Sequence, residues 1–109
     1  MSSICLYISI SVLGNLCDCD FKTNKKSFST KKLKKINKSI QRIVEEINDL
    51  TYGTKETLEQ INYRDTAKLT VIDYAIEYGF DDIVSALIKK GVTLSKKNRK
   101  ELKNIKLNI

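Results

Sequence analysis

The sequence predicts an all-α fold built around a short helical hairpin, with further helices covering both of its flanks. Between Asp65 and Ser95, apolar residues recur at helical steps in two short sets, with Gly79 between them and Gly91 after them. A longer stretch, residues 29–50, has the same helical periodicity. With 109 residues and no proline, the chain has room for one small domain with tails.

The hairpin has capping residues at its expected helix ends. Thr70 can cap the first helix, and Asp81 or Asp82 places a carboxylate at the positive end of the second. Lys89 and Lys90 fall in the last turn, where cations suit the negative end of the helix dipole. Both helices are too short to be stable alone, so we expect them to depend on packing.

These residues resemble an ankyrin repeat, a unit of roughly 33 residues that combines a β-turn with two antiparallel helices. The resemblance covers one repeat, residues 65–95, and Ile61-Asn62 resembles the end of a preceding one. The following positions match the family pattern: Asp65, Thr70, Ile72, Ala75, Gly79, Ile83, Val84, Leu87, Ile88 and Gly91.

Four positions depart from that pattern. Val71 replaces the proline and Asp73 the histidine of the Thr-Pro-Leu-His element, and Phe80 replaces a later histidine. Asp73 can still accept hydrogen bonds at the turn. Lys68 stands where the family has a turn glycine, which disfavours a tight left-handed turn there.

The resemblance implies a protein-interaction module in which the turn tip and the exposed side of the first helix contact the partner. Transferred position by position, the partner-binding residues are Thr66, Ala67, Leu69, Glu77 and Tyr78. Leu69 and Tyr78 are the expected anchors, because apolar and aromatic side chains contribute most to interfaces. The alternative is that both pack on a flanking helix.

Residues 1–28 are predicted to be a poorly ordered tail, apolar at first and then basic. The apolar run from Ile4 to Leu16 is too short for a membrane span of about 20 residues. It suits a secretory signal in length, but Met-Ser-Ser lacks the positive residues that usually precede one. An intracellular location is therefore favoured, with secretion as the alternative. Alternating apolar residues also fit an isolated strand.

Residues 22–38 form the strongest block of charge, with eight lysines and no acid. The lysines are Lys22, Lys25, Lys26, Lys31, Lys32, Lys34, Lys35 and Lys38. Residues 39–88 hold ten acids against four bases, so the centre of the chain is acidic. The basic flank suggests contact with nucleic acid or an anionic membrane, although a solvated flank is the simpler interpretation.

Residues 29–50 are predicted to form a capping helix on the repeat. Its apolar stripe is Leu33, Ile36, Ile40, Ile43, Val44, Ile47 and Leu50. Ser29 or Thr30 can cap its start. Thr54 to Gln60 are expected to add a short helix with Leu58 and Ile61 facing inward, and residues 96–109 a basic C-terminal cap.

The sequence gives no support for catalysis, a cofactor or a metal site. Histidine, the commonest general base, is absent, and the glycines do not form a phosphate-binding loop. Cys17, Asp18, Cys19 and Asp20 offer metal ligands, but neighbours in an extended chain point to opposite sides. We therefore expect a non-catalytic protein-interaction module, with a basic protein that contacts nucleic acid or anionic membrane as the alternative.

One repeat is fewer than the three that arrays usually need. Either the flanking helices complete the core, or the chain is a remnant of a longer array that folds on its partner.

Overall fold

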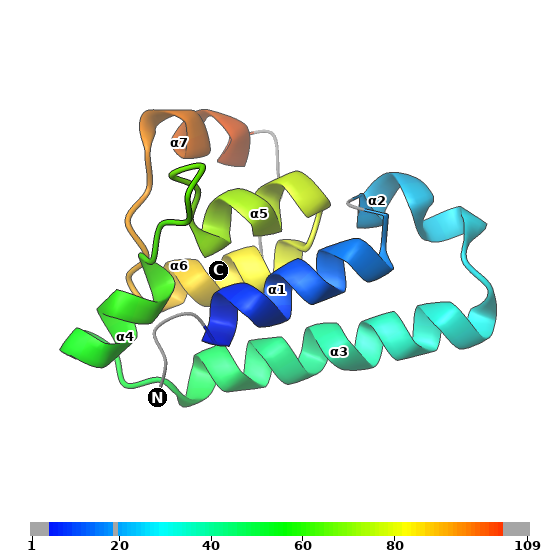
Figure 1. The fold of residues 1–109 in the computed structure, drawn as a ribbon, viewed down its shortest axis with the longest axis horizontal. Coiled ribbons are helices and arrows are strands. Elements are labelled where there is room, and N and C mark those ends of the chain that lie inside the picture. Colours follow the sequence, from blue (N-terminus) through cyan, green and yellow to red (C-terminus); the bar gives the residue numbers. More distant parts are fainter. Residues whose placement is uncertain (1–4, 19, 104–109) are drawn as a thin grey trace.

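The computed structural model describes residues 5–18 and 20–103, and these residues form an all-α fold (Figure 1). The helices are α1 (Cys5–Leu16), α2 (Phe21–Asn24), the 3₁₀ turn η1 (Lys25–Ser27), α3 (Thr30–Asp49), α4 (Lys55–Ile61), α5 (Val71–Tyr78), α6 (Asp81–Lys89) and α7 (Lys96–Leu102). The all-α prediction is confirmed.

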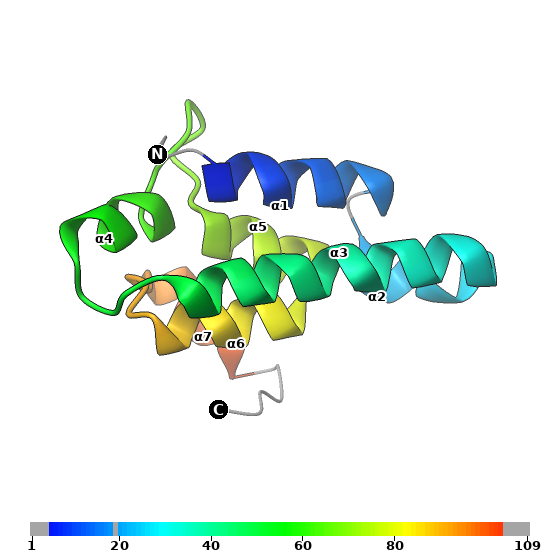
Figure 2. The same ribbon diagram turned by 90° about the horizontal axis from the view of Figure 1, so that it is seen from below.

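The helices pack as two stacked pairs. Helices α5 and α6 form the hairpin, α1 packs along α5, α3 packs along α6, and α1 and α3 also contact each other. Figures 1 and 2 show α1 and α3 running side by side in opposite directions. Helix α7 packs on α5. The hairpin is therefore covered by helices from both ends of the chain.

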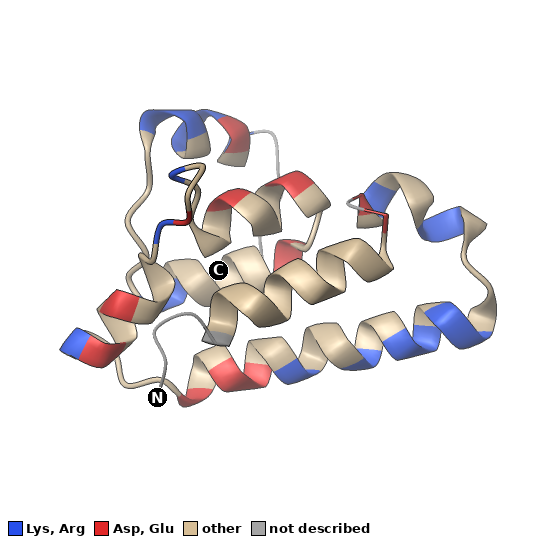
Figure 3. Cartoon of the chain, viewed as in Figure 1, with Lys and Arg blue, Asp and Glu red and all other residues tan. Residues whose placement is uncertain are grey.

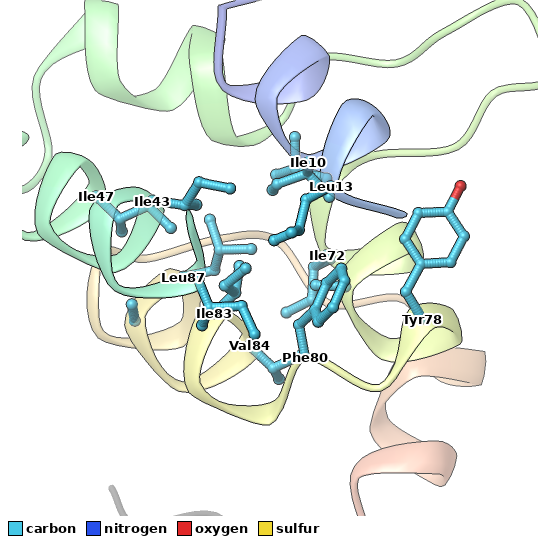
Figure 4. Packing of buried hydrophobic residues seen from close by; sticks show 14 of the residues in the cluster. Ile10, Leu13, Ile43, Ile47, Ile72, Tyr78, Phe80, Ile83, Val84 and Leu87 are labelled. Atoms are coloured by element: carbon cyan, nitrogen blue, oxygen red, sulfur yellow. The ribbon is translucent and has the colours of Figure 1, made fainter. Parts of the chain in front are cut away.

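Helix α1 corrects the prediction of a poorly ordered tail and the alternative of a strand. Leu6, Ile10, Leu13 and Cys17 are buried in the single hydrophobic cluster. Their spacing of four, three and four residues is that of one helix face. Figure 4 shows Ile10 and Leu13 pointing toward Ile72 of α5. Serines in this helix leave its inner face continuous, because they occupy other positions.

The helix predicted at residues 29–50 is confirmed. Helix α3 begins after Ser29, whose hydroxyl accepts a hydrogen bond from the backbone N–H of Lys32 at 3.2 Å. Its buried residues, Ile36, Ile40, Ile43 and Ile47, come from the predicted stripe. Across from them lie Ile83, Val84 and Leu87 of α6, which are fully buried (Figure 4).

The ends of the hairpin helices follow the capping prediction. Asp73 accepts hydrogen bonds from the backbone N–H of Thr70 at 2.8 Å and from its hydroxyl at 3.1 Å. Gly79 ends α5 in the left-handed conformation, with φ of 83°. Phe80 follows at 1% exposure, so the residue that replaces a family histidine is a core residue.

The shorter helices are partly as predicted. Thr54 caps α4, and Ile61 is fully buried, but Leu58 is 38% exposed and the expectation that it faces inward is wrong. Ser95 caps α7, and the last part of the expected C-terminal cap, 104–109, lies outside the described residues. None of the helices within residues 5–18 and 20–103 has the length and apolar character needed to cross a bilayer.

Helix α1 approaches α5 so closely that only glycine fits at position 14. A Cβ atom placed on Gly14 would lie 2.3 Å from Cε2 of Tyr78. Tyr78 itself is confined by neighbouring rings, with centroids 5.6 Å from Tyr74 and 6.0 Å from Phe80. The ring therefore has little freedom to give way.

We predict that Gly14→Ala destabilises the fold, although the same change in an unconstrained helix stabilises it by about 1 kcal/mol. Overpacking against Tyr78 should cost about 1–3 kcal/mol, measured by urea denaturation. In a Tyr78→Leu background the cost should shrink, because the smaller side chain makes room. An equal cost in both backgrounds would contradict the close approach.

Candidate interaction surface

The turn that precedes α5 is organised by the Asp65 carboxylate. One carboxylate oxygen accepts hydrogen bonds from the backbone N–H groups of Ala67 and Leu69, both at 2.9 Å. Backbone bonds close the loop, from Lys68 N–H to the Asp65 carbonyl and from Asp65 N–H to the Leu69 carbonyl. The turn therefore has one defined conformation.

The hydroxyls of two tyrosines also donate hydrogen bonds to this carboxylate. The other oxygen of Asp65 accepts hydrogen bonds from the hydroxyls of Tyr7, at 3.0 Å, and Tyr74. Tyr7 belongs to α1 and Tyr74 to α5, so Asp65 joins the turn to both helices. The Tyr7 ring also packs against Tyr63 and Tyr74, with centroid distances of 5.4 and 5.7 Å.

These hydrogen bonds shift the ionisation of the groups that share them. The Tyr74 hydroxyl, followed by the Leu69 N–H, holds the pKa of Asp65 below its ordinary value of 3.8. Conversely, the hydrogen bond to Asp65 raises the pKa of Tyr74, because the hydroxyl must keep its proton to donate that bond, and burial raises it further. Asp65 is therefore an ionised acceptor at neutral pH.

The structure brings together only part of the expected partner-binding set. Thr66 and Ala67 are exposed at the tip of the turn, and Leu69 is half-buried beside them. Glu77 is exposed but lies in the last turn of α5, about 10 Å along the helix from its start. It therefore lies apart from the tip.

Tyr78 is not the exposed anchor that was expected. It is 9% exposed and packs in the core against α1, Tyr74 and Phe80. The alternative interpretation, packing on a flanking helix, is therefore correct for Tyr78, and that helix is α1. The reason is the course of the N-terminal segment, which covers the side of α5 that was expected to face a partner.

The expectation that the turn at Lys68 is not left-handed is also wrong. Lys68 adopts φ of 64°, the region that favours glycine, and its N–H bonds the Asp65 carbonyl at 2.9 Å. Its own carbonyl accepts a hydrogen bond from the Arg64 guanidinium at 3.2 Å. The bonds to Asp65 and Arg64 hold the turn in a conformation that the lysine disfavours by itself.

The basic block lies at one end of the molecule, on α2, η1 and the first half of α3 (Figure 3). Two of its lysines rest over aromatic rings, Lys25 over Phe21 and Lys32 over Phe28. Lys22 pairs with Asp81 at the start of α6, at 2.9 Å. Most of this charge remains on exposed side chains, because seven of the eight lysines are exposed and Lys32 is half-buried.

The grooves on the surface do not gather catalytic groups. One charged groove lies between α3 and α6, and its titratable lining groups are Asp81, Asp82 and Lys89. Within the described residues, no three metal-binding side chains come together. Of the two cysteines considered as metal ligands, Cys17 is buried and Cys19 lies outside the described residues.

Comparison with models of protein families, with curated proteins and with solved structures finds no match to this chain. The ankyrin resemblance therefore stays a prediction that depends on the residues of the hairpin.

Tyr7 and Tyr74 are the residues of this site that sequence reasoning missed. Asp65 was identified as the turn aspartate. The tyrosines that donate hydrogen bonds to it lie 58 residues earlier and nine residues later in the chain. Tyr74 falls on the inner side of the predicted first helix, so the sequence pattern could have identified it. Tyr7 required knowing that the N-terminal segment is a helix.

We predict that Asp65→Asn lowers the urea midpoint at neutral pH, because the amide replaces an acceptor with a donor toward two hydroxyls. The folded pKa is depressed, so the contribution of Asp65 is fully present above pH 3.8 and is lost as pH falls through the folded pKa.

The difference in the free energy of unfolding between wild type and Asp65→Asn should therefore be constant near neutral pH. It should become smaller as the pH falls below 3.8. Urea denaturation across this range measures it. A gap that is independent of pH down to strong acid would show that the ionised carboxylate is not what holds the turn.

Proposed function

We propose that this chain is a non-catalytic protein-interaction domain of the ankyrin repeat type, and that its partner contacts the turn at residues 65–69. The observation that carries the proposal is the exposed tip held by Asp65. Its backbone is fixed before any partner arrives, so binding would cost little ordering entropy. Thr66 and Ala67 present a small, accessible surface, and Leu69 adds apolar area.

The stacking of the helices supports the comparison with repeat proteins. In a repeat array each hairpin contacts only its neighbours. Here α1 and α3 cover one side of the α5–α6 hairpin, and α7 lies on α5. This packing would supply the neighbours that a single repeat lacks.

A contact between two connecting loops gives further support. The side-chain oxygen of Asn62 accepts a hydrogen bond from the backbone N–H of Thr93, 31 residues later, at 3.0 Å. Ile61 and Val92, the preceding residues, are both buried. A separation close to the repeat length of roughly 33 residues is what equivalent positions of adjacent units would have.

The second candidate is binding of nucleic acid or anionic membrane through the basic end. It is favoured by the position of α3, a twenty-residue helix whose positive end carries lysines and no acid in its first turn. Against it, the described lysines are not interleaved with exposed aromatic residues that would stack on bases, since Phe21 is buried and Phe28 half-buried.

The test is affinity capture of proteins from the source cells on the immobilised full chain. We predict that Ala67→Glu abolishes capture of a partner, because the new carboxylate lies at the tip of the turn. Leu58→Ser, an exposed apolar site on α4 outside the turn, is the matched control and should retain the partner. Circular dichroism should show equal helix content in all three chains.

Binding at the turn should persist at about 0.5 M salt, where exposed charges are strongly screened. Equal capture by wild type and Ala67→Glu would contradict the proposal. Binding that disappears in salt and on reversing Lys31, Lys34 and Lys35 to glutamate would instead support the second candidate.

A further inference from the structure

Helix α1 has apolar side chains on its outer face as well as its inner one. The helix contains no charged residue, although 30% of the chain is charged. Ile8 is 47% exposed and Val12 is 63% exposed, one helical turn apart on the side away from the core. Ser9, Ser11 and Asn15 are polar, so the outer face is apolar only in part, at Ile8 and Val12. Exposed apolar residues that lie together on one face are typical of a surface that contacts another molecule.

The exposed residues border a groove rather than a convex surface. The groove lies between α1 and α3, and its volume is about 280 Å³. The wall on the α1 side is formed mainly by Ile8, Val12 and Leu16, with Ser9 and Leu13 beside them. Arg42 and Glu46 of α3, also one turn apart, form the opposite wall. An apolar strip therefore lies beside a pair of opposite charges.

The two charged residues of the groove are arranged so that α3 complements a reversed copy of itself. A two-fold axis across the groove, passing between Arg42 and Glu46, would set two α3 helices in opposite directions. Arg42 of each copy would then lie beside Glu46 of the other.

We propose that the groove between α1 and α3 is the interface of a two-fold symmetric homodimer. The Ile8 and Val12 side chains of each copy pack against those of the other, and Arg42 of each copy pairs with Glu46 of the other. This surface is separate from the turn at residues 65–69 and does not depend on partner binding there.

Charge distinguishes a second copy from a lipid surface as the occupant. An anionic membrane would attract the basic half of α3 but repel Glu46, which lines the groove itself, and Glu45 beside it. A second copy presents both signs of charge at the groove, with Glu46 facing Arg42 and Arg42 facing Glu46. The same argument disfavours a partner of one charge sign.

The first experiment is sedimentation equilibrium of the full chain over a range of concentrations. We predict a monomer–dimer equilibrium for the wild type. Val12→Lys should weaken it by at least about tenfold, because a lysine would be buried between the two apolar faces. Position 12 is largely exposed in the single chain, so this change should leave the circular dichroism spectrum unaltered.

A charge-swap experiment tests the symmetry of the contact. In Arg42→Glu, two glutamates of one copy face two of the other, and in Glu46→Arg, two arginines face two arginines. Each variant alone should be monomeric at concentrations where the wild type is dimeric. An equimolar mixture should form a heterodimer, because both contacts are then between opposite charges. Glu45→Arg, an exposed charge of α3 outside the groove lining, is the control and should stay dimeric.

Three results would overturn the proposal. One is a wild type that is monomeric at every concentration, including one that binds neutral lipid vesicles through Val12. Another is a dimer that Val12→Lys leaves unchanged. The last is a failure of the mixed variants to associate while the Glu45→Arg control remains dimeric.

Discussion

The packing of α1 against α5 is the constraint on which the rest of the structure depends. Helix α5 has only eight residues, and α6 has nine, so neither is stable without a covering layer. Leu6, Ile10 and Leu13 provide that layer on α5, and α3 provides it on α6. The absence of a side chain at Gly14 allows the Tyr78 ring to pack directly against α1. The α5–α6 hairpin is in this way covered by other helices of the same chain.

The same helix fixes the exposed turn. Asp65 accepts hydrogen bonds from Tyr7 of α1 and Tyr74 of α5 while it orients the backbone of the tip. Loss of α1 contacts would therefore loosen the turn as well as the core. The proposed interaction site and the stability of the domain share one carboxylate, which links the N-terminal segment to whatever the tip binds.

The hairpin and α3 could be predicted from sequence because their features are local. Capping residues, glycines at helix ends and the apolar stripe of α3 all act within a few residues. Helix α1 was missed because alternate apolar residues, with Ile8 and Val12 among them, imitated a strand or a signal segment. The informative pattern was the spacing of Leu6, Ile10, Leu13 and Cys17, which is that of one helix face. Apolar residues on the opposite face made this pattern hard to recognise.

The exposure of the proposed partner-binding residues was predicted less well, since it depends on how the helices assemble. Tyr78 lies in the core because α1 covers it, and position alone in the hairpin did not contain that information. Lys68 shows a different case, in which hydrogen bonds with Asp65 and Arg64, three and four residues earlier, stabilise a backbone conformation that the lysine itself opposes. A tertiary contact decided the outcome for Tyr78, and hydrogen bonds within the turn decided it for Lys68.

The most direct test of this account is urea denaturation of the full chain beside a chain that begins at Ser27, followed by circular dichroism. Burial of Leu6, Ile10 and Leu13 contributes about 1.5–3 kcal/mol per side chain, which together approaches the whole net stability of a small domain, about 5–15 kcal/mol. The account predicts one cooperative transition for the full chain and none for the shortened one. A cooperative transition with the same midpoint in both would contradict a core built on α1.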